Sequence, residues 1–299
     1  MKLIVQPDAG IAPIISAIKQ ARKWVDILIF RLDRPEIARA LGEAVARGVR
    51  VRALTAHQNR GGTKSLRKLE MQLLEAGVTV SRTADDLVRY HGKMVIVDNK
   101  SLHVYGFNFT GLDIEKSRSF GIVTKNEKLV NEATKLFTAD FDRQPYTPGS
   151  GRFVVSPENA RDVLSKFLSG ARKELLIYDP KVSDGSMVRA LEDRVSKGVE
   201  VRILGNVGKR GTRLRCLKLA GIRLHARVII RDGRQAFLGS QSLRPPELDI
   251  RREIGLIVKN AAMVRALRAV FVKDWQASAP KEETVPDTSR TTAAAEATA

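Results

Sequence analysis

Short apolar runs alternate with longer amphipathic segments along most of the chain. Each run is bounded by polar residues or glycine, as buried strands are, and the runs of the first half lie at residues 2–5, 25–31, 49–54, 78–81, 94–97, 102–105 and 120–124. The segments between them have the apolar spacing of helices, at 12–23, 35–46, 64–76 and from 127 onward. This alternation predicts an α/β fold.

The second half repeats the same order of elements. Its predicted helices and strands lie at 158–169, 174–178, 187–196 and 199–204. Residues 38–54 and 188–204 share Arg-Ala-Leu, a glycine and Val-x-Val-Arg at matching positions. Similarity over so long a distance indicates a duplicated domain, because the repeats of a solenoid are only about 20 to 50 residues long.

Changes of composition suggest the domain boundaries. Residues 144–152 are rich in proline and glycine, as linkers are, and beyond Trp275 the chain is mostly Ala, Thr, Glu and Pro with no apolar period. We therefore expect a first lobe at residues 1–145, a second lobe at 146–275 and a disordered tail at 276–299.

One polar motif accompanies a buried strand in each half. His91, Lys93 and Asp98 flank the apolar run 94–97, and His225, Arg227 and Asp232 recur 134 residues later around a similar run. Two-residue periodicity places the histidine and the cation on one face at the start of the strand. Packing alone does not explain a repeated polar triplet, so the motif indicates a functional site.

Charge and composition narrow the class of protein. The formal charge of +19 over 299 residues predicts a polyanionic partner, either nucleic acid or anionic lipid headgroups. A single cysteine excludes an intramolecular disulfide, and four histidines make a zinc cluster improbable, so we expect no cofactor and no metal. No run approaches the roughly 18 apolar residues of a membrane span, and no signal peptide is evident. We expect a cytoplasmic protein whose contact with an anionic membrane, if any, is peripheral.

The densest basic cluster lies in the second half. Lys209, Arg210, Arg213 and Arg215 fall within seven residues, at a place matching the Gly61-Gly62 loop of the first half. The cluster is either a solvated basic face or a rim that gathers phosphates near the site.

The paired motifs resemble those of the phospholipase D superfamily. The pattern His-x-Lys-x4-Asp followed by Gly-Phe-Asn-Phe-Thr at 106–110, repeated in diverged form at 225–242, covers with its flanking elements nearly all of the chain except the tail. The resemblance implies two similar lobes, each a mixed β-sheet flanked by helices, with both motifs meeting at the lobe interface in one metal-independent phosphodiesterase site. Because one chain carries both motifs, we expect a monomer.

The resemblance also implies a role for each motif residue. His91 is expected to be the nucleophile that forms a phosphohistidine, and His225 the general acid and later the base. Lys93 and Arg227 are expected to hold the phosphate oxygens, with a further hydrogen bond donated by Asn108. These roles suit the chemistry, because a phosphodiester needs a nucleophile, an acid for the leaving alkoxide and fixed positive charge.

The chain departs from the family's pattern at several positions. The second cation is Arg227 where the family has lysine, which keeps the charge but changes the geometry. The downstream Gly-Ser-x-Asn is divided: the first copy keeps Asn108 without the serine, and the second keeps Ser240 but has Ser242 in place of asparagine. Both serines are expected to contact substrate.

A further departure concerns the residues that orient the two histidines. Eleven residues beyond the asparagine position the family has an acid, which here is Ser119 in the first half and Glu253 in the second. The resemblance therefore implies that Glu253 holds His91, while Ser119, also counted among the substrate-binding residues, is a weaker partner for His225. Seven residues beyond each histidine, Asp98 and Asp232 are expected to be structural.

Three classes of function follow from these observations. The favoured one is a phosphoric diester hydrolase of the phospholipase D type, acting on phospholipid headgroups in lipid metabolism. The same site also supports a metal-independent endonuclease. The departures at Arg227, Ser119 and Ser242 leave a degenerate polyanion-binding pseudoenzyme as a third alternative.

Overall fold

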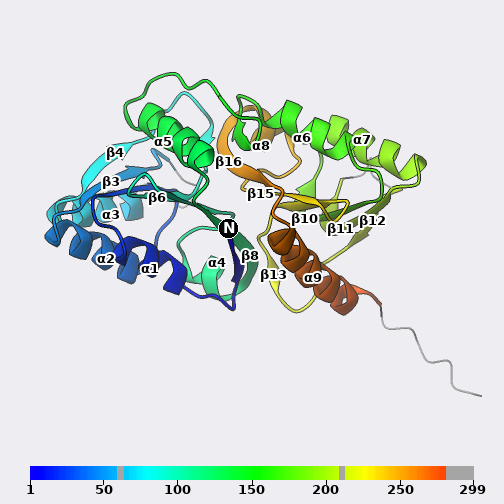
Figure 1. The fold of residues 1–299 in the computed structure, drawn as a ribbon, viewed down its shortest axis with the longest axis horizontal. Helices are drawn as coiled ribbons and strands as arrows, with labels where there is room; N and C mark the ends of the chain where they lie inside the picture. Colours follow the sequence, from blue (N-terminus) through cyan, green and yellow to red (C-terminus); the bar gives the residue numbers. More distant parts are fainter. Residues whose placement is uncertain (59–63, 209–212, 281–299) are drawn as a thin grey trace, which may run out of the picture.

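Two mixed β-sheets flanked by helices form the protein (Figure 1). The computed structural model describes residues 1–58, 64–208 and 213–280, and each sheet has eight strands in this part of the chain. The predicted α/β fold with two similar halves is confirmed. The Gly61-Gly62 loop, Lys209 and Arg210 of the basic cluster, and most of the expected tail lie outside the described residues.

The first sheet is built mainly from the first half of the chain. Its strand order is β1 (Lys2–Gln6), β8 (Ser117–Thr124), β7 (Ser101–Tyr105), β6 (Met94–Val97), β2 (Trp24–Ile29), β3 (Arg50–Thr55) and β4 (Thr79–Arg82). Three helices pack on one face, α1 (Ala12–Lys19), α2 (Pro35–Ala46) and α3 (Lys64–Glu75), and α5 (Glu127–Phe141) packs on the other.

The second sheet repeats this plan. Its strand order is β12 (Arg215–Leu217), β11 (Glu200–Val207), β10 (Glu174–Val182), β14 (Val228–Arg231), β15 (Gln235–Gly239) and β16 (Arg251–Val258), and β9 (Phe153–Ser156) also pairs with β16. The helices α6 (Ala160–Ser169) and α7 (Gly185–Ser196) cover one face, and α9 (Ala261–Ser278) covers the other.

Each half donates one short strand to the sheet of the other half. β5 (Arg89–Tyr90) pairs in parallel with β16, and β13 (Arg223–Leu224) pairs in parallel with β8. A continuous apolar cluster also joins the halves, because α5 and α9 belong to the same buried core as the facing sides of both sheets. The exchanged strands matter for function, since a motif histidine follows each of them directly.

Asp98 and Asp232 hold the chain at the ends of two strands, as expected of structural residues. The Asp98 carboxylate accepts hydrogen bonds from the backbone N–H groups of residues 22, 23 and 24, and Asp232 does the same for residues 172, 173 and 174. These bonds explain why the helix predicted at 12–23 ends at Lys19, because amides held by a carboxylate do not continue a helix.

Two five-residue helices were not predicted. α4 (Gly111–Glu115) precedes β8, and α8 (Pro245–Asp249) precedes β16. Their brevity hides any helical period in the sequence, and α4 carries a residue of the site described next. Residues 276–278, which were expected to belong to the tail, are helical, since α9 continues to Ser278.

Candidate active site

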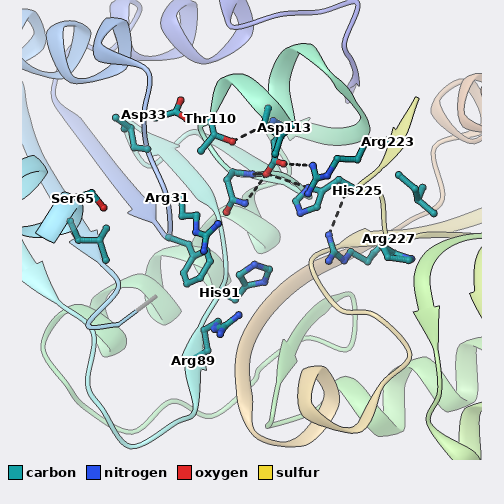
Figure 2. Close-up of a pocket in the computed structure, with 17 residues that line it drawn as sticks. Arg31, Asp33, Ser65, Arg89, His91, Thr110, Asp113, Arg223, His225 and Arg227 are labelled. Carbon is teal, nitrogen blue, oxygen red and sulfur yellow. Dashed lines mark hydrogen bonds and ion pairs between the residues drawn. The ribbon is translucent and has the colours of Figure 1, made fainter. Parts of the chain in front are cut away.

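A pocket of about 650 Å³ brings the two motif histidines together (Figure 2). Its polar lining comes from both halves of the chain, and the side chains are Arg31, Asp33, Ser65, Arg89, His91, Asn108, Thr110, Asp113, Arg223, His225 and Arg227. One chain therefore supplies both motifs to one pocket, as the resemblance implies.

The exchanged strands place both histidines by backbone hydrogen bonds. After β5, the His91 N–H donates to the Arg252 carbonyl at 2.7 Å, and after β13 the His225 N–H donates to the Arg118 carbonyl at 3.1 Å. Each histidine is thus held by the sheet of the opposite half. Both residues are only 8% exposed, so the rings that line the pocket have little freedom to move.

Glu253 contacts His91 as predicted. Its Oε2 lies 2.9 Å from His91 Nδ1 and its Oε1 lies 3.1 Å away, within the range of a hydrogen bond. On the other side of the ring, Lys93 Nζ lies 2.8 Å from Nε2. A lysine ammonium only donates, so Nε2 accepts and the ring proton sits on Nδ1, from which it is donated to Glu253. In this tautomer the ring's one lone pair is on Nε2, where it accepts the hydrogen bond from Lys93.

Burial shifts the pKa values of His91, Lys93 and Glu253. Burial, together with the positive charges of Lys93 and Arg227, lowers the pKa of His91 well below its usual value, which keeps the ring neutral and nucleophilic. Burial also lowers the pKa of Lys93 to about 7. The pKa of Glu253 is raised by burial, against the opposing effect of Lys93.

The two cations lie differently around the site. Arg227 lines the pocket, where its Nη1 donates to the His225 carbonyl at 3.3 Å and its Nε to Ser242 Oγ at 3.4 Å. Lys93 is 1% exposed, contacts Nε2 of His91 and is not among the residues that line the pocket. Lys93 therefore reaches a phosphate only when that phosphate approaches Nε2, whereas Arg227 faces it from the start.

Asp113, and not Ser119, is the partner of His225. Asp113 Oδ2 lies 3.4 Å from His225 Nδ1, which is close but longer than a good hydrogen bond. Ser119 is completely buried and donates its hydroxyl to the Asp113 carbonyl at 3.3 Å. The assignment of Ser119 to His225 was thus wrong, because the short Ser119 side chain is engaged elsewhere while α4 delivers a carboxylate to the same ring.

The same carboxylate also holds Asn108. Asp113 Oδ2 accepts from the Asn108 backbone N–H at 2.9 Å and from its Nδ2 at 2.7 Å. One of the two amide hydrogens is therefore engaged, and the second remains for the phosphate bond that the resemblance implies.

The serines expected to contact substrate lie outside the pocket lining. Ser240 Oγ accepts from the Ile254 N–H at 3.1 Å, and Ser242 Oγ accepts from Arg227. Neither these two nor Ser119 is more than 2% exposed. Their hydroxyls contact the backbone and site residues instead of the pocket. The prediction that these serines contact substrate is therefore not supported by their positions.

Several pocket residues escaped the sequence analysis. Arg89 and Arg223 stand two residues before the motif histidines, at equivalent places in the two copies, and both line the pocket. That equivalence was a usable signal. Phe30 gave none: its ring packs edge-on against His91 with 4.6 Å between centroids and lies 5.6 Å from the Arg31 guanidinium.

The fold and the paired histidines define the class of protein. The chain belongs to the phospholipase D superfamily: residues 14–141 and 164–275 match the family described as "Cardiolipin synthase, PLD-like domain". Within the part of the chain that the structure describes, no helix is long and apolar enough to cross a membrane, and no group of three or more His, Cys, Asp or Glu side chains is placed to hold a metal ion.

Curated relatives are similar at low identity. A probable cardiolipin synthase, YwiE, of Bacillus subtilis is 23% identical over 93% of this chain and 66% of its own length. The mitochondrial cardiolipin hydrolase of Homo sapiens is 28% identical over 46% of this chain and 51% of its own length. The chain thus spans about half to two thirds of the relatives it matches.

Solved structures share the fold. A polyphosphate kinase from Porphyromonas gingivalis superposes with a TM-score of 0.76 at 16% identity, over 92% of this chain and 50% of its own. A phosphatidylserine synthase from Haemophilus influenzae superposes with a TM-score of 0.67 at 13% identity, over 93% of this chain and 86% of its own. At these identities the likeness concerns the fold alone.

Proposed function

We propose that the protein hydrolyses phosphodiester bonds of phospholipid headgroups through a phosphohistidine on His91. The observation that carries the proposal is the Glu253, His91 and Lys93 group beside a pocket shared with His225: Glu253 holds Nδ1 protonated, and Nε2 becomes free to attack when Lys93 turns from it to a phosphate oxygen. That arrangement matches an activated nucleophile with an acid opposite it.

The reaction has two balanced steps. His91 Nε2 forms a bond to phosphorus while the bond to the headgroup oxygen breaks, and His225 gives that oxygen its proton. Water then attacks the same phosphorus, His225 takes a proton from the water, and the P–N bond breaks to release a phosphomonoester lipid. Lys93 and Arg227 stabilise the charge that develops on the non-bridging oxygens.

An apolar groove beside the pocket favours a lipid. The groove lies between α2 and α3, has a volume of about 870 Å³ and shares Leu32, Asp33 and Ser65 with the lining of the catalytic pocket. Its remaining lining comes from Pro35, Ala38, Gly42, Ala46, Leu69 and Ala76, with the polar residues Arg39, Glu43, Lys68 and Gln72. The twelve residues of α2 span about 18 Å, enough for much of an acyl chain. Nucleotides have no comparable apolar part to bury there.

A nuclease is the second candidate, favoured by the four arginines Arg31, Arg89, Arg223 and Arg227 in the pocket lining. Single-stranded DNA carries the repeated charge that such a lining attracts. The pseudoenzyme alternative is weaker than the sequence suggested, because Asp113 supplies the carboxylate that Ser119 lacks.

Activity on a substrate series, run on the wild type and on Ala38→Phe, tests the proposal. The series contains short-chain and long-chain phosphatidylglycerol, single-stranded DNA and bis(p-nitrophenyl) phosphate. We expect turnover of the lipids and of the small diester, and Ala38→Phe should raise KM for the long-chain lipid alone. Cleavage of DNA with intact lipid would establish the nuclease, and polyanion binding without any turnover would establish the pseudoenzyme.

A further inference from the structure

The two histidines differ in where the nearby carboxylate lies in the sequence. Glu253 reaches His91 from the position directly after the Arg252 carbonyl that accepts the His91 N–H. Ser119 occupies the equivalent position, directly after the Arg118 carbonyl that accepts the His225 N–H. The two halves therefore have the same backbone arrangement at both histidines, but only one of them has an acid there.

Asp113 compensates from a different element. It lies six residues before Ser119, on α4, and is 2% exposed. Its Oδ1 accepts from Arg223 Nη1 at 2.7 Å, and the same Nη1 donates to Ser117 Oγ at 2.8 Å. Figure 2 shows Asp113, Arg223 and His225 gathered on one side of the pocket. The carboxylate is thus held by an arginine from the other half while it faces the ring.

We infer that Asp113 is the positioning residue of His225, and that Arg223 fixes Asp113 in this role. The inference rests on the proposed two-histidine reaction. It assigns to α4 the task that the strand after the asparagine motif performs for His91. Asp113 touches neither phosphorus nor the leaving group, and acts by holding Nδ1–H so that Nε2 faces the leaving oxygen.

The charges around His225 give this role a measurable consequence. Burial and Arg227 lower the pKa of His225, Lys93 and Arg223 lower it further, and Asp113 raises it. For Asp113 itself, burial favours the neutral acid, but His225, the Asn108 N–H and Arg223 outweigh that effect, so its pKa is lowered and it stays ionised. Loss of Asp113 therefore removes the anion that favours protonated His225.

The chain contains a matched control. Glu247 stands 134 residues after Asp113, at the equivalent place on α8, and is also buried. It pairs with Arg251 at 2.6 Å and with Arg244 at 3.1 Å instead of facing a histidine. Glu247→Gln therefore removes a similarly buried carboxylate whose ion-pair partners are arginines and not His225.

The experiment compares Asp113→Asn, Glu247→Gln and the double variant Asp113→Asn/Ser119→Glu. With a phospholipid substrate, Asp113→Asn should lose about 10- to 100-fold in kcat with little change in KM, the usual effect of removing a group that orients a functional histidine. The basic limb of its kcat/KM profile should move to lower pH. Glu247→Gln should keep the wild-type profile, and the double variant should recover much of the lost kcat.

A titration of His225 by NMR provides a readout that does not depend on turnover. Its pKa should fall in Asp113→Asn and remain unchanged in Glu247→Gln. The NMR titration tests the inference even if the double variant does not fold. It also tests the inference if the wild type has no activity, and that outcome would refute the proposed function alone. An unchanged His225 pKa in Asp113→Asn, an equal kcat loss in Glu247→Gln, or a folded double variant as slow as Asp113→Asn would overturn the inference.

Discussion

Glu253 Oε2 lies 2.9 Å from His91 Nδ1, although 162 residues separate the two in the chain. The contact exists because β5 leaves the first half and pairs with β16, which brings His91 beside the start of a strand of the second half. The site therefore forms only when the two halves pack against each other.

Replacing Glu253 with Gln should impair chemistry more than folding. Gln keeps the shape, but its amide also fits the other tautomer of His91, and the negative charge that stabilises a cationic ring is lost. We expect kcat to fall on the order of 10²- to 10⁴-fold. Steady-state kinetics and a thermal melt check this, and near-normal kcat in a folded Glu253→Gln protein would contradict it.

Arg227 should act as a fixed phosphate clamp. Arg227→Ala should lose about 2.7 to 4 kcal/mol of transition-state stabilisation, the range for a removed oxyanion contact. Arg227→Lys keeps the charge and should cost less than about tenfold in rate, because only the planar geometry changes. Comparison of kcat/KM for the two variants tests the assignment, and equal losses would show that charge is not what Arg227 contributes.

Catalysis should persist in excess chelator. Lys93 and Arg227 lie beside His91 and His225 and supply the positive charge that a metal ion provides in other phosphodiesterases. Hydrolysis rates measured with and without EDTA should agree. A loss of activity that added divalent metal restores would refute this view of the site.

Asp140 should make stability depend on pH. Burial, opposed by Arg252, raises the pKa of Asp140 to about 6 from 3.8. The fold thus favours the protonated acid, so this stabilisation is complete below the unfolded value of 3.8 and is lost as the pH rises through about 6. Chemical denaturation at several pH values should show a flatter profile between pH 4 and 6 in Asp140→Asn than in wild type. Identical slopes would contradict the assignment.

Much of this organisation was predictable from the sequence, because the second half repeats the order of apolar runs and polar motifs found in the first half. The apolar runs gave the main strands, and the repeated histidine, cation and aspartate gave the motif residues. Asp98 and Asp232 were predicted to be structural because their position at the end of a strand keeps them from the phosphate; in the structure their carboxylates accept hydrogen bonds from backbone amides.

The features that the sequence did not predict are those that depend on contacts between the two halves. Strands β5 and β13 have two residues each, too few to carry any period, yet they place both histidines. Asp113 was missed although the equivalent position of the second copy, Glu247, is also acidic; the two acids do different things in the structure, because Glu247 faces arginines. The choice between Asp113 and Ser119 depends on how α4 turns, which local sequence does not encode.

The central claim is the phosphohistidine on His91, and trapping it is the most direct test. In a His225→Ala variant given bis(p-nitrophenyl) phosphate, the nitrophenolate leaves without a proton, so the first step proceeds while the second lacks its base. Mass spectrometry of peptides from the quenched protein should find an acid-labile nitrophenyl phosphoryl group on His91, and none in His91→Ala. A phosphoryl group on His225 of the His91→Ala protein, or steady turnover by that variant, would contradict the account.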